Sequence, residues 1–223
     1  MHESILDESP WPRARLAANG GPALLYKTAR PKLDSALLAT VYAGVAAHVG
    51  DIGIGPAEID VPHPARIGAH KSCPAGFMAD LGRIGDLVRP RSSRLCGNSG
   101  SIVVCEWAAP HVDTTFAGSA FYSVVLGTGE YPYVVQNLMT RARTSPDGTL
   151  VHEVKSCSRV LSPGDAFVLD PSVTHWTAPK YPADGQLLVL LQFELRDRTP
   201  EDRADLFRTL PPAPEDQDNA QFL

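Results

Sequence analysis

Short runs of β-branched and aromatic residues, separated by turns, fill the second half of the 223-residue chain and limit its fold more than any other feature. Such runs are typical of β-strands. They cover residues 101–107, 121–126, 131–139, 150–154, 166–169 and 187–193. Between two of them, Pro146-Asp147-Gly148 indicates a hairpin turn. No interval is long enough for a crossover helix, so the sequence predicts a mainly β, antiparallel sandwich or barrel.

Helical periodicity replaces this pattern in the first half of the chain. One helix is expected to start near Asp34 or Ser35, and a second to stop before Pro90. Their apolar residues recur at helical spacing: Leu37, Leu38, Val41, Tyr42, Val45 and Val49 in the first, and Phe77, Leu81, Ile84 and Val88 in the second. A third, short helix is expected from the Thr199 N-cap to about Leu210.

These patterns predict one structural domain in three parts. Residues 1–95 supply an irregular N-terminal arm and the supporting helices, residues 96–196 the β core, and residues 197–223 the short helix and an acidic tail whose last dozen residues are expected to be mobile. We expect Val124, Val168, Val189 and Leu191 inside the β core, and Phe77, Leu81 and Ile84 on the helix that covers it.

The net charge and the hydropathy of the chain argue against nucleic acid and membranes as partners of the protein. The 20 Lys and Arg against 25 Asp and Glu leave a net charge of −5, which gives no global attraction to nucleic acid. The longest apolar run falls short of the ~20 residues that span a bilayer, so no membrane association is expected. The first residues are acidic, where a secretory signal is basic and then apolar, and we therefore expect a cytoplasmic protein.

The motif most informative about chemistry is Pro110-His111-Val112-Asp113, just after the first expected strand. In extended backbone, residues i and i+2 point to the same side, so His111 and Asp113 can offer an imidazole nitrogen and a carboxylate oxygen to one ion. A third ligand is available in His175, which follows a Pro-Gly-Asp turn, an apolar strand and a second turn. Two histidines and one carboxylate suit Fe(II) with open positions for a co-substrate and O₂.

Simpler interpretations of these residues remain open at this point. The alternatives are a turn or a salt bridge for the His111–Asp113 pair, and a buried structural histidine for His175. A weaker candidate for a metal cluster is formed by His63, His70 and Cys73, which lie in a proline-rich irregular segment.

The run from Pro110 through the Asp147-Gly148 hairpin to His175 resembles the double-stranded β-helix, or jelly-roll, core of the Fe(II)/2-oxoglutarate-dependent dioxygenases. The resemblance covers residues 102–194, and the helical first half fits the helices that support that core. It implies iron held by His111, Asp113 and His175, with 2-oxoglutarate as co-substrate. Decarboxylation of 2-oxoglutarate would then drive oxidation of a C–H bond in a small-molecule or peptide substrate.

One position departs from that family. Its members usually place Arg or Lys at the start of the last core strand to bind the distal carboxylate of 2-oxoglutarate, whereas this chain has Asp184-Gly185-Gln186-Leu187 there. A carboxylate in a semi-enclosed pocket favours a cation. We expect Lys180 or Arg196 to supply it. The remaining candidates are Arg141, Arg143 and Lys155.

A second resemblance is to the cupins. Gly164-Asp165, followed eleven residues after the glycine by His175, is similar to their second motif, although Asp170 and Ser172 stand where that motif prefers proline and glycine. Their first motif is not recognisable, because Asp113 replaces its second histidine. This resemblance implies a β-barrel that binds a metal or a small molecule without oxygenase activity. Neither resemblance identifies the substrate or the oligomeric state.

Overall fold

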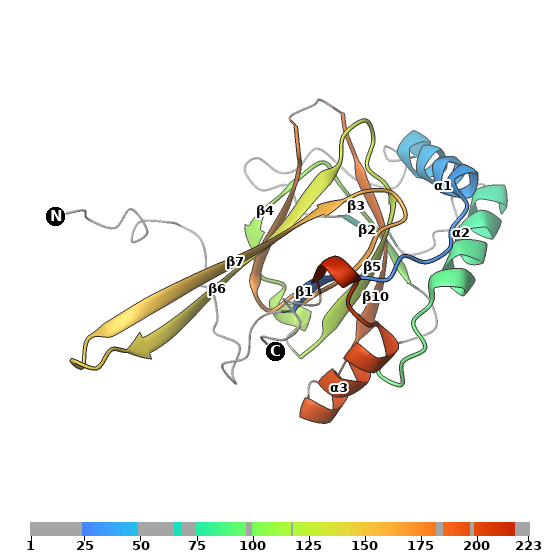
Figure 1. The fold of residues 1–223 in the computed structure, drawn as a ribbon. Helices are drawn as coiled ribbons and strands as arrows, with labels where there is room; N and C mark the ends of the chain where they lie inside the picture. Colours follow the sequence, from blue (N-terminus) through green and yellow to red (C-terminus); the bar gives the residue numbers. More distant parts are fainter. Residues whose placement is uncertain are drawn as a thin grey trace.

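Two stacked antiparallel sheets form the body of the protein, with helices against the larger one (Figure 1). The computed structural model describes residues 24–48, 65–67, 75–96, 100–116, 118–181, 185–196 and 199–216. The large sheet has the order β1 (Leu25–Thr28), β8 (Ala166–Leu169), β5 (Ala120–Gly127), β10 (Leu188–Leu195), β3 (Ser101–Cys105), β2 (Ala65–Ile67). The small sheet has the order β4 (Ala108–His111), β9 (Thr174–Pro179), β6 (Tyr133–Thr144), β7 (Leu150–Leu161).

The order in which the chain visits the two sheets is that of a jelly roll. Strands β3, β5, β8 and β10 lie in the large sheet, and the strands between them, β4, β6, β7 and β9, lie in the small sheet. The chain therefore passes back and forth between the two sheets, as it does in a double-sheet jelly roll. The predicted fold class, mainly β with a jelly-roll core and supporting helices, is confirmed.

Four strands were not expected from the sequence. β4 has the sequence Ala-Ala-Pro-His, which contains no β-branched or aromatic residue, and β9 has Thr-His-Trp-Thr-Ala-Pro, in which the strand-favouring Thr and Trp residues are few and are interrupted by His175. They form because each pairs with a neighbour in the small sheet. The irregular arm predicted for residues 1–30 is wrong at its end, because β1 pairs with β8 at one edge of the large sheet. β2 pairs with β3 at the opposite edge.

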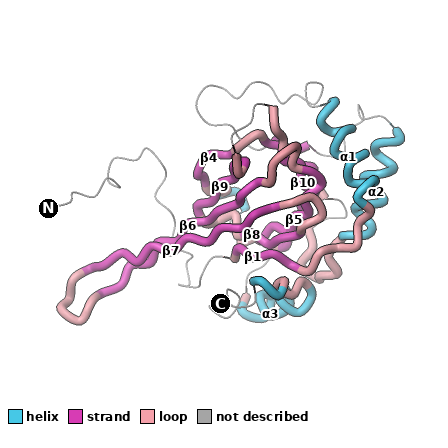
Figure 2. The backbone as a smooth tube through the Cα atoms, turned by 45° about the horizontal axis from the view of Figure 1, so that its top comes forward, coloured by secondary structure: helices cyan, strands magenta, loops and turns pink. Residues whose placement is uncertain are grey.

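Helices α1 (Ser35–His48) and α2 (Ala75–Val88) cover the outer face of the large sheet, as both views show (Figures 1 and 2). The Asp34 carboxylate accepts a hydrogen bond from the Ala36 amide at 2.8 Å, as expected of a residue that caps a helix. Tyr42 lies so close to β5 that a Cβ at Gly127 would stand 2.1 Å from its ring, which only glycine avoids. None of the described helices is long and apolar enough to cross a membrane.

The predicted packing is found for the described side chains. Val124, Val168, Val189 and Leu191 are buried in the cluster between the large sheet and the helices, and Leu81 and Ile84 face them from α2. The side chain of Phe77, the remaining member of that prediction, lies outside the described residues. The expected register of the last core strand is therefore correct.

The space between the two sheets changes character along its length. Most of it is filled by an apolar cluster: Leu25, Val103, Cys105, Val125, Tyr133, Val135, Leu161, Phe167, Leu169, Leu188 and Leu190. Side chains two residues apart share a face of a strand. Asn137, Ser123 and Gln192 therefore continue the inward faces of β6, β5 and β10, and they are polar. This polar end is where a site can be built.

The C-terminal segment is attached to the body, contrary to the expectation of a mobile tail. Helix α3 (Pro200–Thr209) begins with the predicted Thr199 cap. After it, the Ala213 amide donates to the Lys27 carbonyl oxygen at 2.7 Å. Asp216 is 1% exposed, accepts a hydrogen bond from the Lys27 amide and forms an ion pair with Arg159. These contacts tie residues 212–216 to β1 and β7; residues 217–223 lie outside the described residues.

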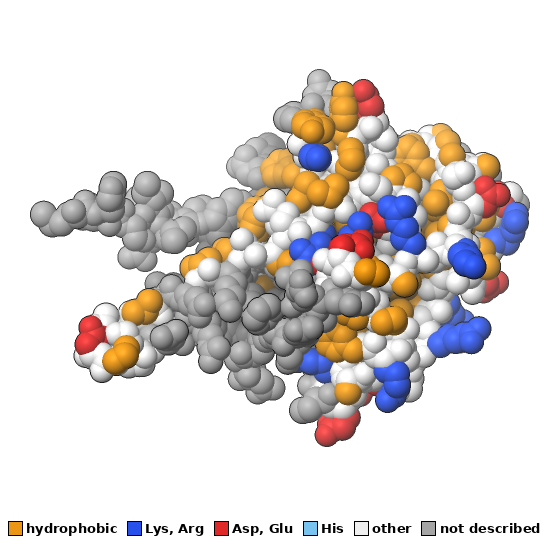
Figure 3. All heavy atoms as spheres, viewed as in Figure 1, with side chains coloured by type: hydrophobic (Ala, Val, Ile, Leu, Met, Phe, Trp, Pro, Cys, Tyr) orange, Lys and Arg blue, Asp and Glu red, His pale blue; other side chains and the backbone are white. Residues whose placement is uncertain are grey.

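The β6–β7 hairpin projects well beyond the sandwich (Figure 1). Its pairing with β9 ends at Leu138, while the two strands remain paired with each other as far as Thr144 and Leu150. The turn predicted at Pro146-Asp147-Gly148 is present, and Gly148 adopts a positive φ of 85°. Hydrophobic side chains are exposed along this arm, among them Leu150 and Val154 (Figure 3).

Replacing Leu191 by Ala tests the described core. The Leu191 side chain is 3% exposed and lies on a central strand, so its removal leaves a cavity and should lower the free energy of unfolding by about 2 to 5 kcal/mol. The matched control is Leu87→Ala on α2, where the side chain is 63% exposed and the expected change is within about 0.5 kcal/mol. Urea denaturation measures both; equal effects would show that the core is misplaced.

Candidate metal centre

Two strands of the small sheet bring His111 and His175 together. His111 is the last residue of β4, His175 lies near the start of β9, and the two are direct partners in the antiparallel register. Direct partners in antiparallel strands point to the same face with their Cβ atoms about 5 Å apart. The Asp113 amide donates to the Pro171 carbonyl oxygen at 2.9 Å, which fixes the loop after β4 against the turn before β9.

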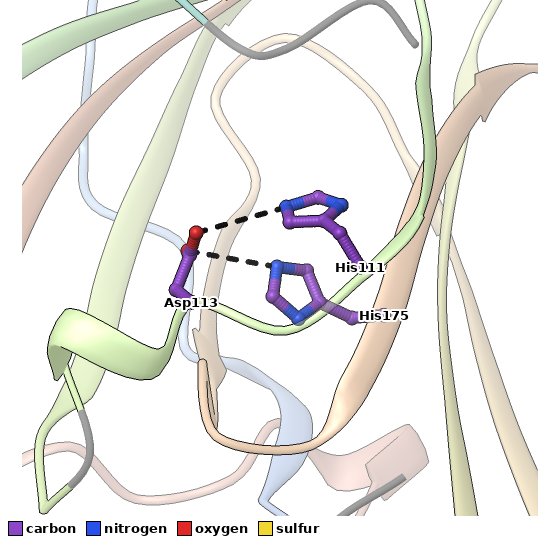
Figure 4. Close-up of side chains that lie close together, drawn as sticks. All are labelled: His111, Asp113 and His175. Atoms are coloured by element: carbon purple, nitrogen blue, oxygen red, sulfur yellow. Dashed lines mark ion pairs between the residues drawn. The ribbon is translucent and has the colours of Figure 1, made fainter. Parts of the chain in front are cut away.

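The three side chains converge on one point (Figure 4). His111 Nε2 lies 3.9 Å from Asp113 Oδ1, and His175 Nε2 lies 3.9 Å from Asp113 Oδ2. The three candidate ligand atoms all lie within 4.8 Å of one another. Donor atoms that bind one ion at about 2.1 Å stand about 3 to 4 Å apart, so small side-chain adjustments suffice to place an ion between them.

Hydrogen bonds to the backbone set the orientation of both imidazoles. His111 Nδ1 lies 2.7 Å from the Ala109 carbonyl oxygen, and His175 Nδ1 lies 2.8 Å from the Val173 carbonyl oxygen. A carbonyl oxygen only accepts, so each Nδ1 carries the proton and each Nε2 keeps a lone pair. Metal-binding histidines are commonly oriented in this way by a second hydrogen bond.

Burial favours the neutral form of His175. Its side chain is 6% exposed, and this burial, followed by the proximity of His111, lowers its pKa to about 4. The imidazole is therefore neutral at neutral pH, the form that binds metals.

His111 provides a direct test of whether these residues fit an ion. Its Nε2 atom is buried and has no hydrogen-bond partner among the described residues. A buried polar atom without a partner is costly and is rare in folded proteins. A cation beside Asp113 and His175 would satisfy this lone pair, so the donor set fits a divalent metal. With two nitrogen ligands and one carboxylate, an octahedral ion keeps three open positions.

Asn137 is part of the same surroundings and was missed by the sequence analysis. It is the register partner of His175 on β6, and it is 2% exposed. On the opposite sheet, the Gln192 amide donates to the Ser123 hydroxyl at 3.4 Å. Tyr133, Val135 and Asn137 share one face of β6, and the change from apolar to polar at Asn137 could have indicated the site. That signal can be used only once it is known which face of β6 points inward.

The residues predicted to bind the distal carboxylate are not part of this group. Lys180 follows β9, is exposed and lies with its Nζ 5.5 Å from the Tyr181 ring centroid. It is five residues beyond His175, about 16 Å along an extended strand. Arg196 follows β10 at the polar end of the sandwich, where its Nε donates to Glu194 Oε1 at 3.0 Å.

Other candidates from the sequence fall outside the described part of the molecule. This holds for the weaker metal cluster of His63, His70 and Cys73, and for the side chains of Arg141, Arg143 and Lys155.

No family model matches the chain, and no curated protein matches its sequence. Among similar solved structures is AviO1 from Streptomyces viridochromogenes Tue57, at 15% identity and a TM-score of 0.46, covering 86% of this chain and 93% of that one. SnoN, a non-heme alpha-ketoglutarate-dependent epimerase from nogalamycin biosynthesis, is similar at 15% identity and a TM-score of 0.45, covering 82% of each chain. Another SnoN structure contains Fe3+, alpha-ketoglutarate and nogalamycin RO.

A prolyl-4-hydroxylase from Pseudomonas putida is similar at 12% identity and a TM-score of 0.44, covering 79% of this chain and 94% of that one. At these identities, each likeness is one of fold.

Removing the carboxylate tests the metal centre. Asp113→Ala deletes the only anionic member of the group, and we expect the dissociation constant for Fe(II) or Mn(II) to rise at least about a hundredfold. Anaerobic calorimetry with Fe(II), or electron paramagnetic resonance with Mn(II), measures this. Circular dichroism should show that the fold is retained. Asp86→Ala, on the exposed side of α2, is the control and should bind like the wild type; equal affinity for all three proteins would rule out this site.

Proposed function

We propose that the protein is an Fe(II)- and 2-oxoglutarate-dependent oxygenase that oxidises a small-molecule or peptide substrate. The observation that carries the proposal is the convergence of two Nε2 atoms and one carboxylate from β4, its following loop and β9. A site closed by four protein ligands serves structure, whereas three ligands leave room for reactants. The proposal is supported by the place of these three side chains at one end of the jelly-roll core, next to the polar side chains of its interior.

Each residue of the group has a distinct task in this function. His111 and His175 would hold the ion through Nε2, while their Nδ1–H groups remain bonded to the backbone. Asp113 would supply the negative charge that retains a divalent cation. Bound iron would supply the capacity to activate O₂ and couple it to oxidation of 2-oxoglutarate and substrate. The apolar cluster behind the site excludes water from the interior.

Arg196 and Lys180 are the two residues expected from the sequence to bind the distal carboxylate of 2-oxoglutarate. Arg196 is supported by its place at the polar end of the sandwich, directly after Leu195 of β10. Lys180 lies at the other end of β9. We therefore favour Arg196, released from Glu194 when the dicarboxylate binds.

We expect residues 1–30, 50–75 and 90–100 to select the substrate, because loops and the helical arm hold the substrate in such barrels. Most of residues 1–30 and 50–75 lie outside the described residues, whereas residues 90–96 and 100 are described. The proposed substrate class is a small molecule or a peptide.

Formation of the ternary complex tests the proposal. Anaerobic Fe(II) and 2-oxoglutarate should together produce a weak visible charge-transfer band that neither produces alone. After admission of O₂, succinate should form. Iron binding without such a band, and without succinate across a broad substrate panel, would contradict the oxygenase function. That result would favour the alternative, a cupin-like protein that binds a metal or small molecule without oxygenase activity.

The same titration separates the two candidate cations. Loss of a charge-assisted contact to a carboxylate should raise the 2-oxoglutarate dissociation constant about ten- to a hundredfold in Arg196→Met. Lys180→Met is the matched control and should bind like the wild type. The reverse result would assign the contact to Lys180, and no change in either variant would exclude both residues.

A further inference from the structure

Asn137 has a buried amide group that the fold itself does not use. The residue is 2% exposed, and its Nδ2 atom has no hydrogen-bond partner among the described residues. Buried polar groups are nearly always paired, and an unpaired one lowers stability. An apolar residue of similar size would avoid this cost. The arrangement therefore indicates a group kept for something other than folding.

The position of Asn137 connects it to the metal centre. It is the direct register partner of His175, which in turn is the direct partner of His111, so the three lie in one row across β6, β9 and β4. Their side chains share the inward face of the small sheet, and the Cβ atoms of Asn137 and His175 are about 5 Å apart. His175 stands between the other two in this row, and both Asn137 Nδ2 and His111 Nε2 lack a hydrogen-bond partner among the described residues.

The neighbours of Asn137 leave its N–H groups without an acceptor. On β7, its register partner Cys157 donates its own thiol to the Leu25 carbonyl oxygen at 3.6 Å. On the same strand, Val135 belongs to the apolar cluster between the sheets. No described residue supplies the acceptor, and a molecule bound at the adjacent candidate metal centre would be placed to supply it.

The side-chain amide nitrogen of Asn137 determines which kind of atom can be its hydrogen-bond partner. An amide nitrogen does not bind metals but donates hydrogen bonds, so the atom it serves is an oxygen acceptor. A ligand bound to an ion at the neighbouring His175 would present such oxygens. We propose that Asn137 Nδ2 donates a hydrogen bond to a carboxylate or keto oxygen of the co-substrate at the metal. This inference rests on the proposed function.

Three substitutions test this role in the complete chain. Asn137→Leu keeps the number and branching of the side-chain heavy atoms but removes the donor. Asn137→Ala removes both, and Asn137→Asp replaces the donor with a negatively charged acceptor. Gln136→Ala is the control, because Gln136 is the next residue on β6 and points to the opposite face. For each variant, an anaerobic Fe(II) titration gives the metal affinity, and the visible band gives the 2-oxoglutarate affinity.

We expect the dissociation constant for 2-oxoglutarate to rise about tenfold or more in Asn137→Ala and Asn137→Leu, and further in Asn137→Asp, where like charges repel. The Fe(II) dissociation constant of the Ala and Leu variants should change less than about threefold, and Gln136→Ala should match the wild type in both. In the metal-free state, Asn137→Leu should unfold at the same temperature as the wild type or higher, because an unpaired donor has been removed.

The outcomes separate this inference from the proposed function. Wild-type affinity for 2-oxoglutarate in the Leu and Ala variants would overturn the role of Asn137 while leaving the oxygenase function intact. A metal-free Asn137→Leu protein that unfolds earlier than the wild type would show a structural role instead. Absence of the band in the wild type would remove the proposed function, and this inference with it.

Discussion

The register between β4 and β9 is the constraint on which the site depends. His111 and His175 are far apart in the sequence, and only their direct pairing in the small sheet places both Nε2 atoms beside Asp113. Because side chains alternate between the faces of a strand, a slip of one residue would turn one imidazole to the outer face. The hydrogen bond from the Asp113 amide to the Pro171 carbonyl oxygen ties the loop that carries the carboxylate to the turn before β9, so all three candidate ligands are positioned by the same pair of strands.

Buried apolar surface elsewhere in the protein offsets the loss of stability caused by unpaired polar atoms at the site. The apolar cluster between the sheets and the larger cluster beneath the helices bury enough hydrophobic surface for a chain of this size to carry several unpaired polar atoms. Two of these atoms, His111 Nε2 and Asn137 Nδ2, lie on the inward face of the small sheet. In the proposed function, a metal ion would complete the bonding of His111 Nε2 and a co-substrate oxygen that of Asn137 Nδ2.

The sequence was most informative where local chemistry and periodicity agree. The His-x-Asp motif, His175, the strand alternation and the Thr199 cap could be predicted because each depends on a few adjacent residues. β4 could not, because it contains no β-branched or aromatic residue, and β9 could not, because its few Thr and Trp residues mark a strand only through the pairing with β4 and β6. Asn137 was missed because its burial is set by β9 and by the opposite sheet, and the docking of Asp216 because it depends on Arg159 and Lys27, far away in the chain. These are contacts that no local pattern contains.

The central claim is that two histidines and one aspartate hold a single ion with positions left open. X-ray absorption spectroscopy of the anaerobic Fe(II) protein tests it most directly, because imidazole ligands give a distinct multiple-scattering signal. The account predicts one iron per chain with two imidazoles among six light-atom ligands, and a changed spectrum with the same two imidazoles after 2-oxoglutarate is added. Sulfur ligands, a number of imidazoles other than two, or a first shell that does not respond to 2-oxoglutarate would contradict it.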